Sequence, residues 1–324
     1  MLTVGILGVG GMGNVHARQY RKMSDVDLIF FDPDAERSKT YIERWSAAPV
    51  SSAEELMSKA DIVDICLPSD LHVQFGLKAV AAGKATVIEK PLTKTFDEGM
   101  QLVNAAEKAS IPVMTAQVVR FFPEFATGNR LVREGKVGTP AAARTRRGGL
   151  APKGSDSWFM DHHRSGGVLL DLAIHDFDWL RWTLGEVKHL FSRSLGALTM
   201  SGPDYALTTL TFESGAIAHC ESTWMDPSGF RTSYEVCGSE GMIEFDSRNT
   251  PSLRTTIEGS KTVNEGPLTG TDDPYYKQLR SFVDAVQKGV PPQVTALDGV
   301  MAVSIAQAAI ESAKTGKLVV PKRP

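Results

Sequence analysis

The chain has few cysteines, no long apolar run and no surplus of positive charge, and each shortage argues against a class of protein. Its three cysteines are an odd number without a CxxC spacing, which argues against a disulfide framework and favours buried thiols in a reducing compartment. No run approaches the ~20 apolar residues of a membrane span, and the first residues are of strand type rather than of the secretory-signal type. We therefore expect a cytoplasmic protein without a membrane partner.

Charge and composition narrow the class further. The 35 lysines and arginines are outnumbered by 38 aspartates and glutamates, which gives a net charge of -3. This balance supplies no broad basic field for a phosphate backbone, so nucleic acid is not an expected partner. A chain of 324 residues with 42% apolar and 23% charged residues is typical of a globular protein with two domains.

The first 118 residues alternate short apolar runs with amphipathic stretches, a pattern typical of a parallel α/β sheet. Ser52 with Glu55 and Thr95 with Glu98 have the spacing of helix capping boxes, and Gly83 stands where a helix over 71–82 would end. Helices are therefore expected between the strands, as crossover connections require. The expected strands are 3–8, 26–32, 62–67, 85–88 and 113–117.

The pattern changes after Gln117, and we expect two domains, 1–118 and 119–324. A helix over 124–134 is followed by segments in which polar and apolar residues alternate. These segments predict two antiparallel hairpins, and the chain then closes with two helices. The hairpin strands are 205–212 with 216–223 and 233–237 with 242–245, and the closing helices are 273–288 and 296–315.

A glycine-rich segment follows the first expected strand and precedes a helical stretch, the context that separates a dinucleotide fingerprint from a chance GxGxxG. Its glycines allow a tight turn, a close approach of the backbone to a pyrophosphate and close packing of helix on strand. The N–H groups at the start of the helix would bind the pyrophosphate. A plain glycine-rich turn is the alternative. The expected dinucleotide-binding residues are Gly8, Gly10, Gly11, Met12 and Gly13.

Asp32 ends the second expected strand, where an acidic side chain can bind the ribose hydroxyls of a dinucleotide. A carboxylate there also repels a 2′-phosphate, so NAD is favoured over NADP. Pro33 offers no positive partner for such a phosphate, whereas Arg37, further on, is a candidate for that role and keeps NADP possible. A solvated aspartate at a strand end is the alternative.

Lys90 lies between Glu89 and Pro91 where the strand over 85–88 ends, at the edge of a parallel sheet where ligands bind. Pro91 restricts the local backbone, so the lysine would be presented from a rigid turn. Next to a nicotinamide, its ammonium could hydrogen-bond a substrate oxygen and stabilise charge as alcohol and carbonyl interconvert. Taken alone, a lysine at a strand end is more often a solvated surface charge.

Asp171 and His175 are four residues apart in a segment with helical periodicity, which predicts that both lie on one face of a helix. Their neighbours are apolar, and a buried polar pair needs partners or a function. A histidine can take a hydroxyl proton while a hydride leaves the carbon, and Asp171 could orient the substrate or the imidazole.

Two other interpretations of this segment stay open. It could hold a metal, because an i, i+4 pair chelates zinc, but no HExxH or comparable spacing completes such a site, so no metal is expected. Its polar groups could instead only satisfy one another within a helix turn. The residues considered for a metal are Asp161, His162, His163, Asp171, His175 and Asp178.

Together these motifs resemble the glucose-fructose oxidoreductase, inositol dehydrogenase and rhizopine-catabolism (Gfo/Idh/MocA) family over nearly the whole chain. Each motif alone is of limited specificity, but their order and spacing are specific. The resemblance rests on the glycine fingerprint, Leu67-Pro68-Ser69 with His72, Gly83-Lys84 ahead of Glu89-Lys90-Pro91, and Gly166-Gly167 ahead of Asp171, His175 and Asp178.

The resemblance implies a Rossmann dinucleotide-binding domain followed by an α/β domain with a large, open, mostly antiparallel sheet whose outer face commonly makes oligomer contacts. It also implies that Lys90, Asp171 and His175 are catalytic, with hydride passing between nicotinamide and a sugar or cyclitol. A homo-oligomer, dimer or tetramer, is expected on the same ground. Positions that line the cofactor in such proteins are matched by Leu67, Pro68, Ser69, His72 and Glu89.

Substrate selectivity is expected to reside in the second domain. Arg144 and Arg146 would share one strand face and bind an anionic group, and Trp158 could stack on a sugar ring. A solvated basic face and a buried aromatic anchor are the alternatives. The candidate substrate residues are Arg120, Arg146, Asp156, Trp158 and His162.

An NAD-dependent dehydrogenase of a sugar, cyclitol or related polyol is thus the leading hypothesis. A second hypothesis keeps the dinucleotide tightly bound and uses a redox cycle for glycoside cleavage or epimerisation. A third is a non-catalytic sensor that binds dinucleotide, which the presence of Lys90, Asp171 and His175 disfavours.

Overall fold

The computed structural model describes residues 1–152, 155–196, 204–249, 253–257, 263–265 and 273–324. The chain divides into two compact units. Met1–Val118 and Asp272–Val300 make up most of the first unit, and the second contains most of 119–271 together with Met301–Pro324. Residues 272–300 thus depart from the expected domain over 119–324, because helix α10 (Pro274–Lys288) packs against α1 (Gly11–Tyr20).

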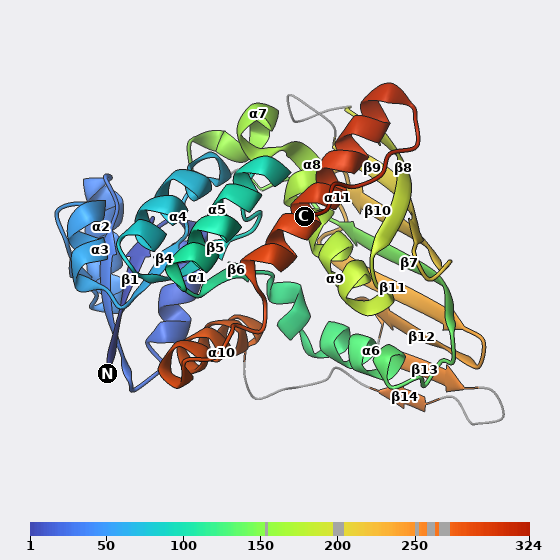
Figure 1. The fold of residues 1–324 in the computed structure, drawn as a ribbon, viewed down its shortest axis with the longest axis horizontal. Coiled ribbons are helices and arrows are strands. Elements are labelled where there is room, and N and C mark those ends of the chain that lie inside the picture. Colours follow the sequence, from blue (N-terminus) through green and yellow to red (C-terminus); the bar gives the residue numbers. More distant parts are fainter. Residues whose placement is uncertain (153–154, 197–203, 250–252, 258–262, 266–272) are drawn as a thin grey trace. The chain divides into compact units, whose positions relative to one another are not determined.

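A parallel sheet of six strands forms the centre of the first unit, in the order β3-β2-β1-β4-β5-β6. Figure 1 labels four of these strands, β1, β4, β5 and β6. Strands β4 (Ile62–Ile65) and β5 (Ala85–Glu89) are buried at every position, as in parallel sheets covered on both faces. The strand order reverses between β1 (Leu2–Leu7) and β4, and ligands bind at the carboxyl ends of strands at such a point. The other strands are β2 (Val26–Phe31), β3 (Ala48–Pro49) and β6 (Val113–Ala116).

Helices connect these strands, and their first turns follow the sequence. The predicted capping box at Thr95 is complete, because the Thr95 and Glu98 side chains each accept the other's backbone N–H. At Ser52 half of the box forms, since Glu55 accepts the N–H of Ser51 instead. The helices are α2 (Ala35–Trp45), α3 (Ala53–Lys59), η1 (Ser69–Leu71), α4 (His72–Ala81) and α5 (Phe96–Ala109).

The second unit contains an eight-stranded sheet in the order β14-β13-β12-β11-β7-β10-β9-β8. All neighbouring strands are antiparallel except β7 (Pro140–Gly148) and β10 (Ile217–Thr223), so the expected mostly antiparallel sheet is confirmed. Both predicted hairpins form. The other strands are β8 (Val187–Leu195), β9 (Tyr205–Phe212), β11 (Arg231–Gly238), β12 (Gly241–Asp246), β13 (Leu253–Ile257) and β14 (Val263–Glu265).

An aromatic cluster anchors helices on the buried face of this sheet. The Phe125 ring centroid lies 5.5 Å from that of Trp179 and 5.2 Å from that of Tyr234. The Trp179 indole N–H donates to the Phe125 carbonyl at 2.9 Å, so α6 (Pro123–Arg133) and α9 (Ile174–Leu184) are joined through this contact. The remaining helices are η2 (Val118–Phe121), η3 (Ser155–Met160), α7 (His162–Ser165), α8 (Gly167–Asp171) and α11 (Ala296–Thr315).

The sequence analysis gave no bounds for β7, where it expected only a strand face shared by Arg144 and Arg146. It did not predict β3, β8, β13 or β14, which are short or have irregular alternation. Within the described ranges, no helix combines the length and the apolar character that crossing a bilayer requires.

Candidate active site

The glycine-rich loop joins β1 to α1 in a conformation that leaves no room for side chains on one side. Gly8 has φ of 90°, and a Cβ on Gly13 would lie 2.1 Å from the Gly8 carbonyl oxygen. A Cβ on Gly10 or Gly11 meets no atom within 4 Å, so the loop is open at that point. Because α1 begins at Gly11 and its first N–H groups point out of the helix end, the loop fits a pyrophosphate.

Asp32 lies directly after β2, and its side chain is 5% exposed. One carboxylate oxygen accepts the N–H of Val9 at 2.9 Å, which ties the strand end to the glycine loop. The other accepts the N–H of Asp34 at 2.9 Å and lies 3.1 Å from Nη2 of Arg37. Arg37, the candidate partner for a 2′-phosphate, is therefore bound to Asp32, and the arrangement retains the carboxylate that NAD recognition requires.

His72 links the loops that follow β4 and β5. Its Nδ1 lies 2.7 Å from the Pro91 carbonyl oxygen, and its Nε2 lies 2.9 Å from that of Leu67. Burial lowers the pKa of this imidazole. Pro68 and Leu67 are half-buried whereas Ser69 is buried, so His72 and Ser69 lie behind the loop surface. The predicted contact of Leu67, Pro68, Ser69 and His72 with the cofactor stays a prediction.

Glu89 and Lys90 stand at the carboxyl end of β5. The Glu89 Oε2 atom accepts the backbone N–H of Lys90 at 3.0 Å, while Oε1 lies 3.0 Å from Nε2 of His16. Glu89 is 6% exposed and Lys90 is half-buried, and the Lys90–Pro91 peptide bond is cis. The lysine is thus presented from a backbone segment that its neighbouring carboxylate holds.

Asp171 and His175 belong to the second unit and lie on two helices rather than one. Helix α8 ends at Asp171, and α9 begins at Ile174. The Ala173 N–H bonds the Val168 carbonyl, five residues back, so the regular helical ladder is interrupted. The expectation of one continuous helix is wrong, although both residues flank the same short turn. Asp171 is 4% exposed and His175 is partly exposed.

Two buried ion pairs attach α9 to its surroundings immediately after His175. Arg147 of β7 makes two contacts with Asp176, at 2.8 and 3.1 Å, and Arg120 of η2 makes two with Asp178, at 2.7 and 2.6 Å. Burial raises the pKa of Asp176, and Arg147 opposes this shift. Such forked pairs restrict the orientation of both side chains, so the start of α9 is held at two positions that are two residues apart.

The two units match separate family descriptions. Residues 2–117 match an oxidoreductase family with an NAD-binding Rossmann fold, and residues 125–244 match the GFO/IDH/MocA C-terminal domain. The chain belongs to the Gfo/Idh/MocA family. It is therefore an oxidoreductase with an NAD-binding Rossmann unit, and the resemblance inferred from the sequence is confirmed.

Named relatives cover most of this Gfo/Idh/MocA chain. The scyllo-inositol 2-dehydrogenase (NAD(+)) of Bacillus subtilis is 28% identical over 96% of the chain and 94% of its own length. The 1,5-anhydro-D-fructose reductase of Ensifer adhaerens is 29% identical over 87% of each. The structure of GenD2 from gentamicin A biosynthesis, in complex with NAD, is similar with a TM-score of 0.88 and 25% identity, covering 99% of this chain and 97% of that one.

Two of the predicted substrate residues, Arg120 and Arg146, form ion pairs with acidic side chains of the second unit. Arg120 is 4% exposed and paired with Asp178, which gives it a structural contact that the sequence analysis did not foresee. Arg146 lies 3.3 Å from Glu221 and 3.1 Å from Asp226 on the outer face of the sheet. The pattern correctly placed Arg144 and Arg146 on one face, but it missed the acidic partners that neighbouring strands supply.

The other three lie in the η3–α7 segment. The Trp158 ring stacks on Phe159 with centroids 3.9 Å apart, and His162 forms an edge contact with His163 at 6.2 Å. The side chain of Asp156 lies outside the described part of the chain. No contact of these residues identifies a substrate, so their role stays a prediction.

The one group in the described residues with donor atoms close enough for a metal is His16, Asp64 and Cys66, in the first unit. The residues that the sequence analysis considered for a metal do not form such a group there. The sequence analysis missed this buried cluster, although a histidine in α1 and an aspartate inside an apolar strand are both detectable signals. The sequence analysis also did not single out Gln117, a polar residue that directly follows β6 and is fully buried.

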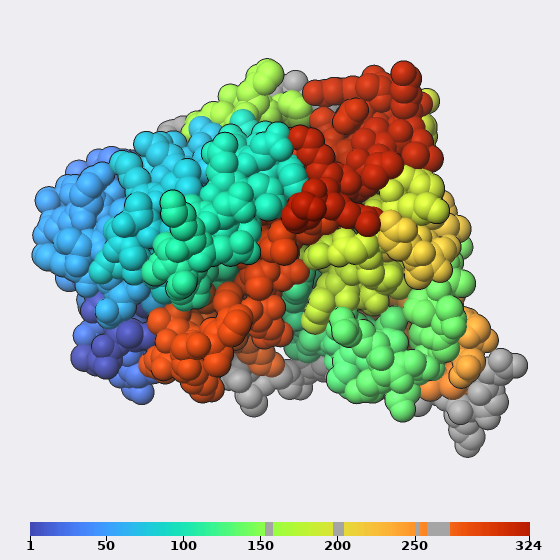
Figure 2. Space-filling model, in the orientation of Figure 1, coloured from blue at the N-terminus to red at the C-terminus, as the bar shows by residue number. Residues whose placement is uncertain are grey.

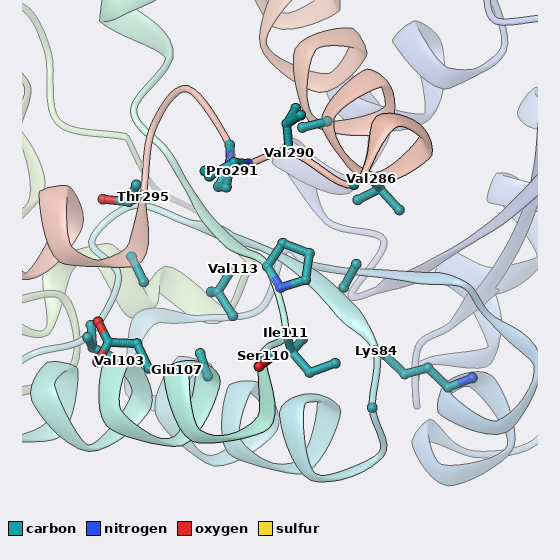
Figure 3. A pocket seen from close by; sticks show the side chains of 18 of the residues that line it. Lys84, Val103, Glu107, Ser110, Ile111, Val113, Val286, Val290, Pro291 and Thr295 are labelled. Atoms are coloured by element: carbon teal, nitrogen blue, oxygen red, sulfur yellow. The ribbon is translucent and has the colours of Figure 1, made fainter.

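A pocket of about 790 Å³ lies in the first unit, at the amino-terminal ends of strands of its sheet. It is lined by Ala85 and Val113, which begin β5 and β6, and by residues of α5 and of the segment after α10 (Figure 3). Figure 2 shows α5 in teal beside α10 in orange on this face. Since ligands of parallel sheets bind at the carboxyl ends, this pocket is distinct from the dinucleotide loop.

Proposed function

We propose that the protein is an NAD-dependent dehydrogenase that oxidises one hydroxyl of a sugar, a cyclitol or a related polyol. The observation that carries the proposal is Lys90, which follows β5 at the carboxyl edge of an NAD-binding sheet and whose peptide is held by Glu89. The names of the inositol dehydrogenase and anhydrofructose reductase relatives support this substrate class.

In this mechanism, bound NAD supplies the hydride acceptor. His175 takes the proton of the reacting hydroxyl during oxidation and returns it during reduction. The Lys90 ammonium donates a hydrogen bond to the reacting oxygen and stabilises the negative charge that develops there. Asp171 binds the neighbouring hydroxyls and orients the sugar, and the paired Asp176 and Asp178 restrain the helix that carries His175.

The preferred dinucleotide is NAD. Asp32 is nearly buried and oriented by Val9 and Arg37, so its oxygens are placed to accept ribose hydroxyls and to repel a 2′-phosphate. Arg37 would have to leave Asp32 before it could bind that phosphate.

A panel of inositols, aldoses and other polyols, assayed separately with NAD and NADP by the absorbance of reduced nicotinamide, tests this function. We expect turnover with at least one polyol and NAD. Activity with NADP alone would contradict the role of Asp32. Product formation without release of NADH would favour the redox-cycle hypothesis, and dinucleotide binding without turnover on any compound would favour a sensor.

We further infer that the chain acts in the cytoplasm as a homo-oligomer. The free cysteines support a reducing compartment, and Leu195, Leu207 and Ile217 expose apolar side chains along β8, β9 and β10. Light scattering coupled to size exclusion checks the assembly. A monomer at micromolar concentration would contradict it.

A further inference from the structure

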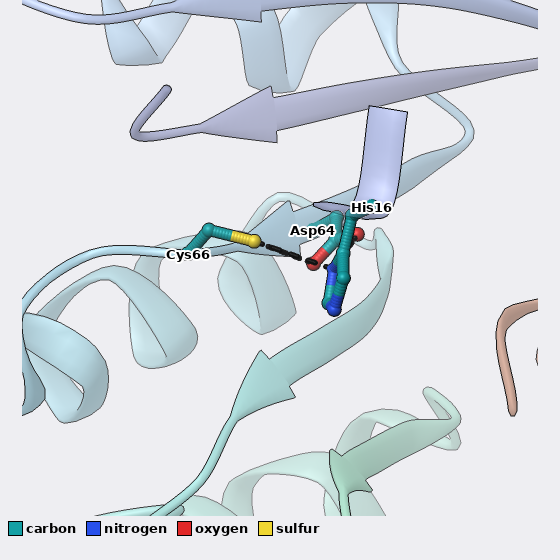
Figure 4. A group of neighbouring side chains, drawn as sticks. All are labelled: His16, Asp64 and Cys66. Atoms are coloured by element: carbon teal, nitrogen blue, oxygen red, sulfur yellow. Dashed lines mark hydrogen bonds and ion pairs between the residues drawn. The ribbon is translucent and has the colours of Figure 1, made fainter. Parts of the chain in front are cut away.

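A histidine that the proposed mechanism does not use is buried on α1, the helix that follows the glycine-rich loop. His16 lies on α1, and its side chain is 0% exposed. Its Nδ1 lies 2.8 Å from an Asp64 carboxylate oxygen, and its Nε2 lies 3.0 Å from Oε1 of Glu89. Figure 4 shows the imidazole beside Asp64 and the Cys66 thiol. The ring therefore bridges two carboxylates from neighbouring strands.

The Nε2 contact with Glu89 is an ion pair without hydrogen-bond geometry, whereas Nδ1 is hydrogen-bonded to Asp64. Ion pairs at both ring nitrogens require a proton on each of them. A neutral imidazole has one N–H, and its other nitrogen would face a carboxylate oxygen with a lone pair. Burial lowers the pKa of His16, but the Asp64 carboxylate and the Cys66 sulfur together outweigh it, so the pKa is raised well above its usual value. The pKa values of the surrounding Cys66 thiol and of the Tyr20 and Tyr41 phenols are raised by burial, so these groups stay neutral.

Glu89 connects this bridge to the candidate catalytic lysine. One of its oxygens faces His16, and the other accepts the backbone N–H of Lys90. A carboxylate fixed at one oxygen has a restricted rotamer, so the position of the second oxygen is restricted as well. His16 is thereby connected to the peptide N–H of Lys90 through Glu89.

We propose that His16 is a positioning residue: as an imidazolium between Asp64 and Glu89, it holds Glu89 so that Glu89 holds the Lys90 peptide at the end of β5. This inference rests on the proposed role of Lys90. A metal at His16, Asp64 and Cys66 is the competing interpretation, because their donor atoms lie within 4.8 Å of one another.

The first test is the protonation state of His16 in the whole protein without substrate. Ring ¹⁵N chemical shifts at pH 8, above the ordinary histidine pKa of about 6.5, should show both nitrogens protonated. In Glu89→Gln, the negative charge beside Nε2 is removed while Asp64 remains, so the pKa of His16 should be lower than in the unaltered protein. A neutral ring in the unaltered protein, or a pKa of His16 that is the same in Glu89→Gln, would overturn the proposal.

The second test is a rescue experiment with the polyol that gives the highest turnover. His16→Gln leaves one carboxylate facing an amide oxygen, and we expect kcat to fall on the order of 10²-fold while the Kd for NAD changes by about threefold or less. In His16→Gln with Glu89→Gln, a continuous donor chain from Lys90 to Asp64 can form again, so kcat should recover about tenfold. Losses that simply add in the double variant would overturn the positioning role.

Controls separate the remaining explanations. Cys66→Ala removes the thiol 3.3 Å from His16 Nδ1 but not the bridge, and its kcat should stay within about twofold. One equivalent of bound metal, lost in Cys66→Ala, would overturn the proposal in favour of a metal site. If Lys90→Ala keeps its turnover, the proposed function is wrong, and the ring shifts still test the bridge between Asp64 and Glu89. If Lys90→Ala loses turnover but His16→Gln does not, only the proposed role of His16 is wrong. Should His16→Gln not fold, the comparison of ring shifts in the unaltered protein and Glu89→Gln decides.

Discussion

Replacing Arg147 with methionine tests whether the buried ion pairs determine how α9 is held. Arg147 and Asp176 are 5% and 1% exposed, and the guanidinium also lies 5.4 Å from the Phe125 ring. Removing one partner of a buried pair costs about 3–5 kcal/mol, because the other charge stays buried without compensation. This is a large fraction of the total stability of a domain, which is about 5–15 kcal/mol.

For a unit of this size, that loss corresponds to a decrease of about 6–20 °C in the unfolding midpoint. Tryptophan fluorescence follows the second unit preferentially, because four of the five tryptophans lie there: Trp158, Trp179, Trp182 and Trp224. Arg147→Met combined with Asp176→Leu removes both charges and should recover most of the midpoint. A midpoint of Arg147→Met within about 2 °C of the unaltered protein would refute the reasoning.

The same variant should respond to pH in a defined direction. Burial raises the pKa of Asp176, and without Arg147 nothing on β7 opposes that shift. A carboxyl group whose folded pKa lies above its unfolded value stabilises the folded state at low pH, and this stabilisation is lost as the pH rises through the folded pKa. The midpoint difference between Arg147→Met and the unaltered protein should therefore grow between pH 4 and pH 7. A difference independent of pH would show that Asp176 is not left charged.

The other predictions concern the cofactor and the reaction. Lys90→Ala and His175→Ala should each lower kcat by about 10²-fold or more while NAD still binds, as measured by nicotinamide fluorescence, and near-normal turnover would exclude the assigned role. Gly10→Ala should fold normally, because its Cβ meets no atom within 4 Å, yet weaken NAD binding by about tenfold or more since the methyl group occupies the open side of the loop. Asp32→Ala should reduce the preference for NAD over NADP by about tenfold or more in kcat/KM, and an unchanged ratio would count against the ribose contact.

Local sequence patterns were sufficient to predict the structural features that depend on residues close together in the chain. Strand and helix periodicity, together with the glycine fingerprint, predicted the first unit because each crossover is encoded within a few dozen residues. The roles proposed for Lys90, Asp171 and His175 rest on residue types and an order that are visible in the chain, and they stay predictions. The partners of Arg120 and Arg146 were not readable, since they lie 58 and 75 or more residues away and only the folded sheet brings them together.

The tertiary structure also corrected a helix that local periodicity predicted wrongly. Four-residue spacing favoured one helix through Asp171 and His175, but packing interrupts the hydrogen-bond ladder at Ala173 and divides the segment into α8 and α9. The bridge from Asp64 through His16 to Glu89 joins three elements that are distant in the chain. The sequence therefore supplied the candidate groups for a dehydrogenase reaction, whereas folding decided which buried charges pair with one another, because charge pairing depends on distances that only the packed sheet establishes.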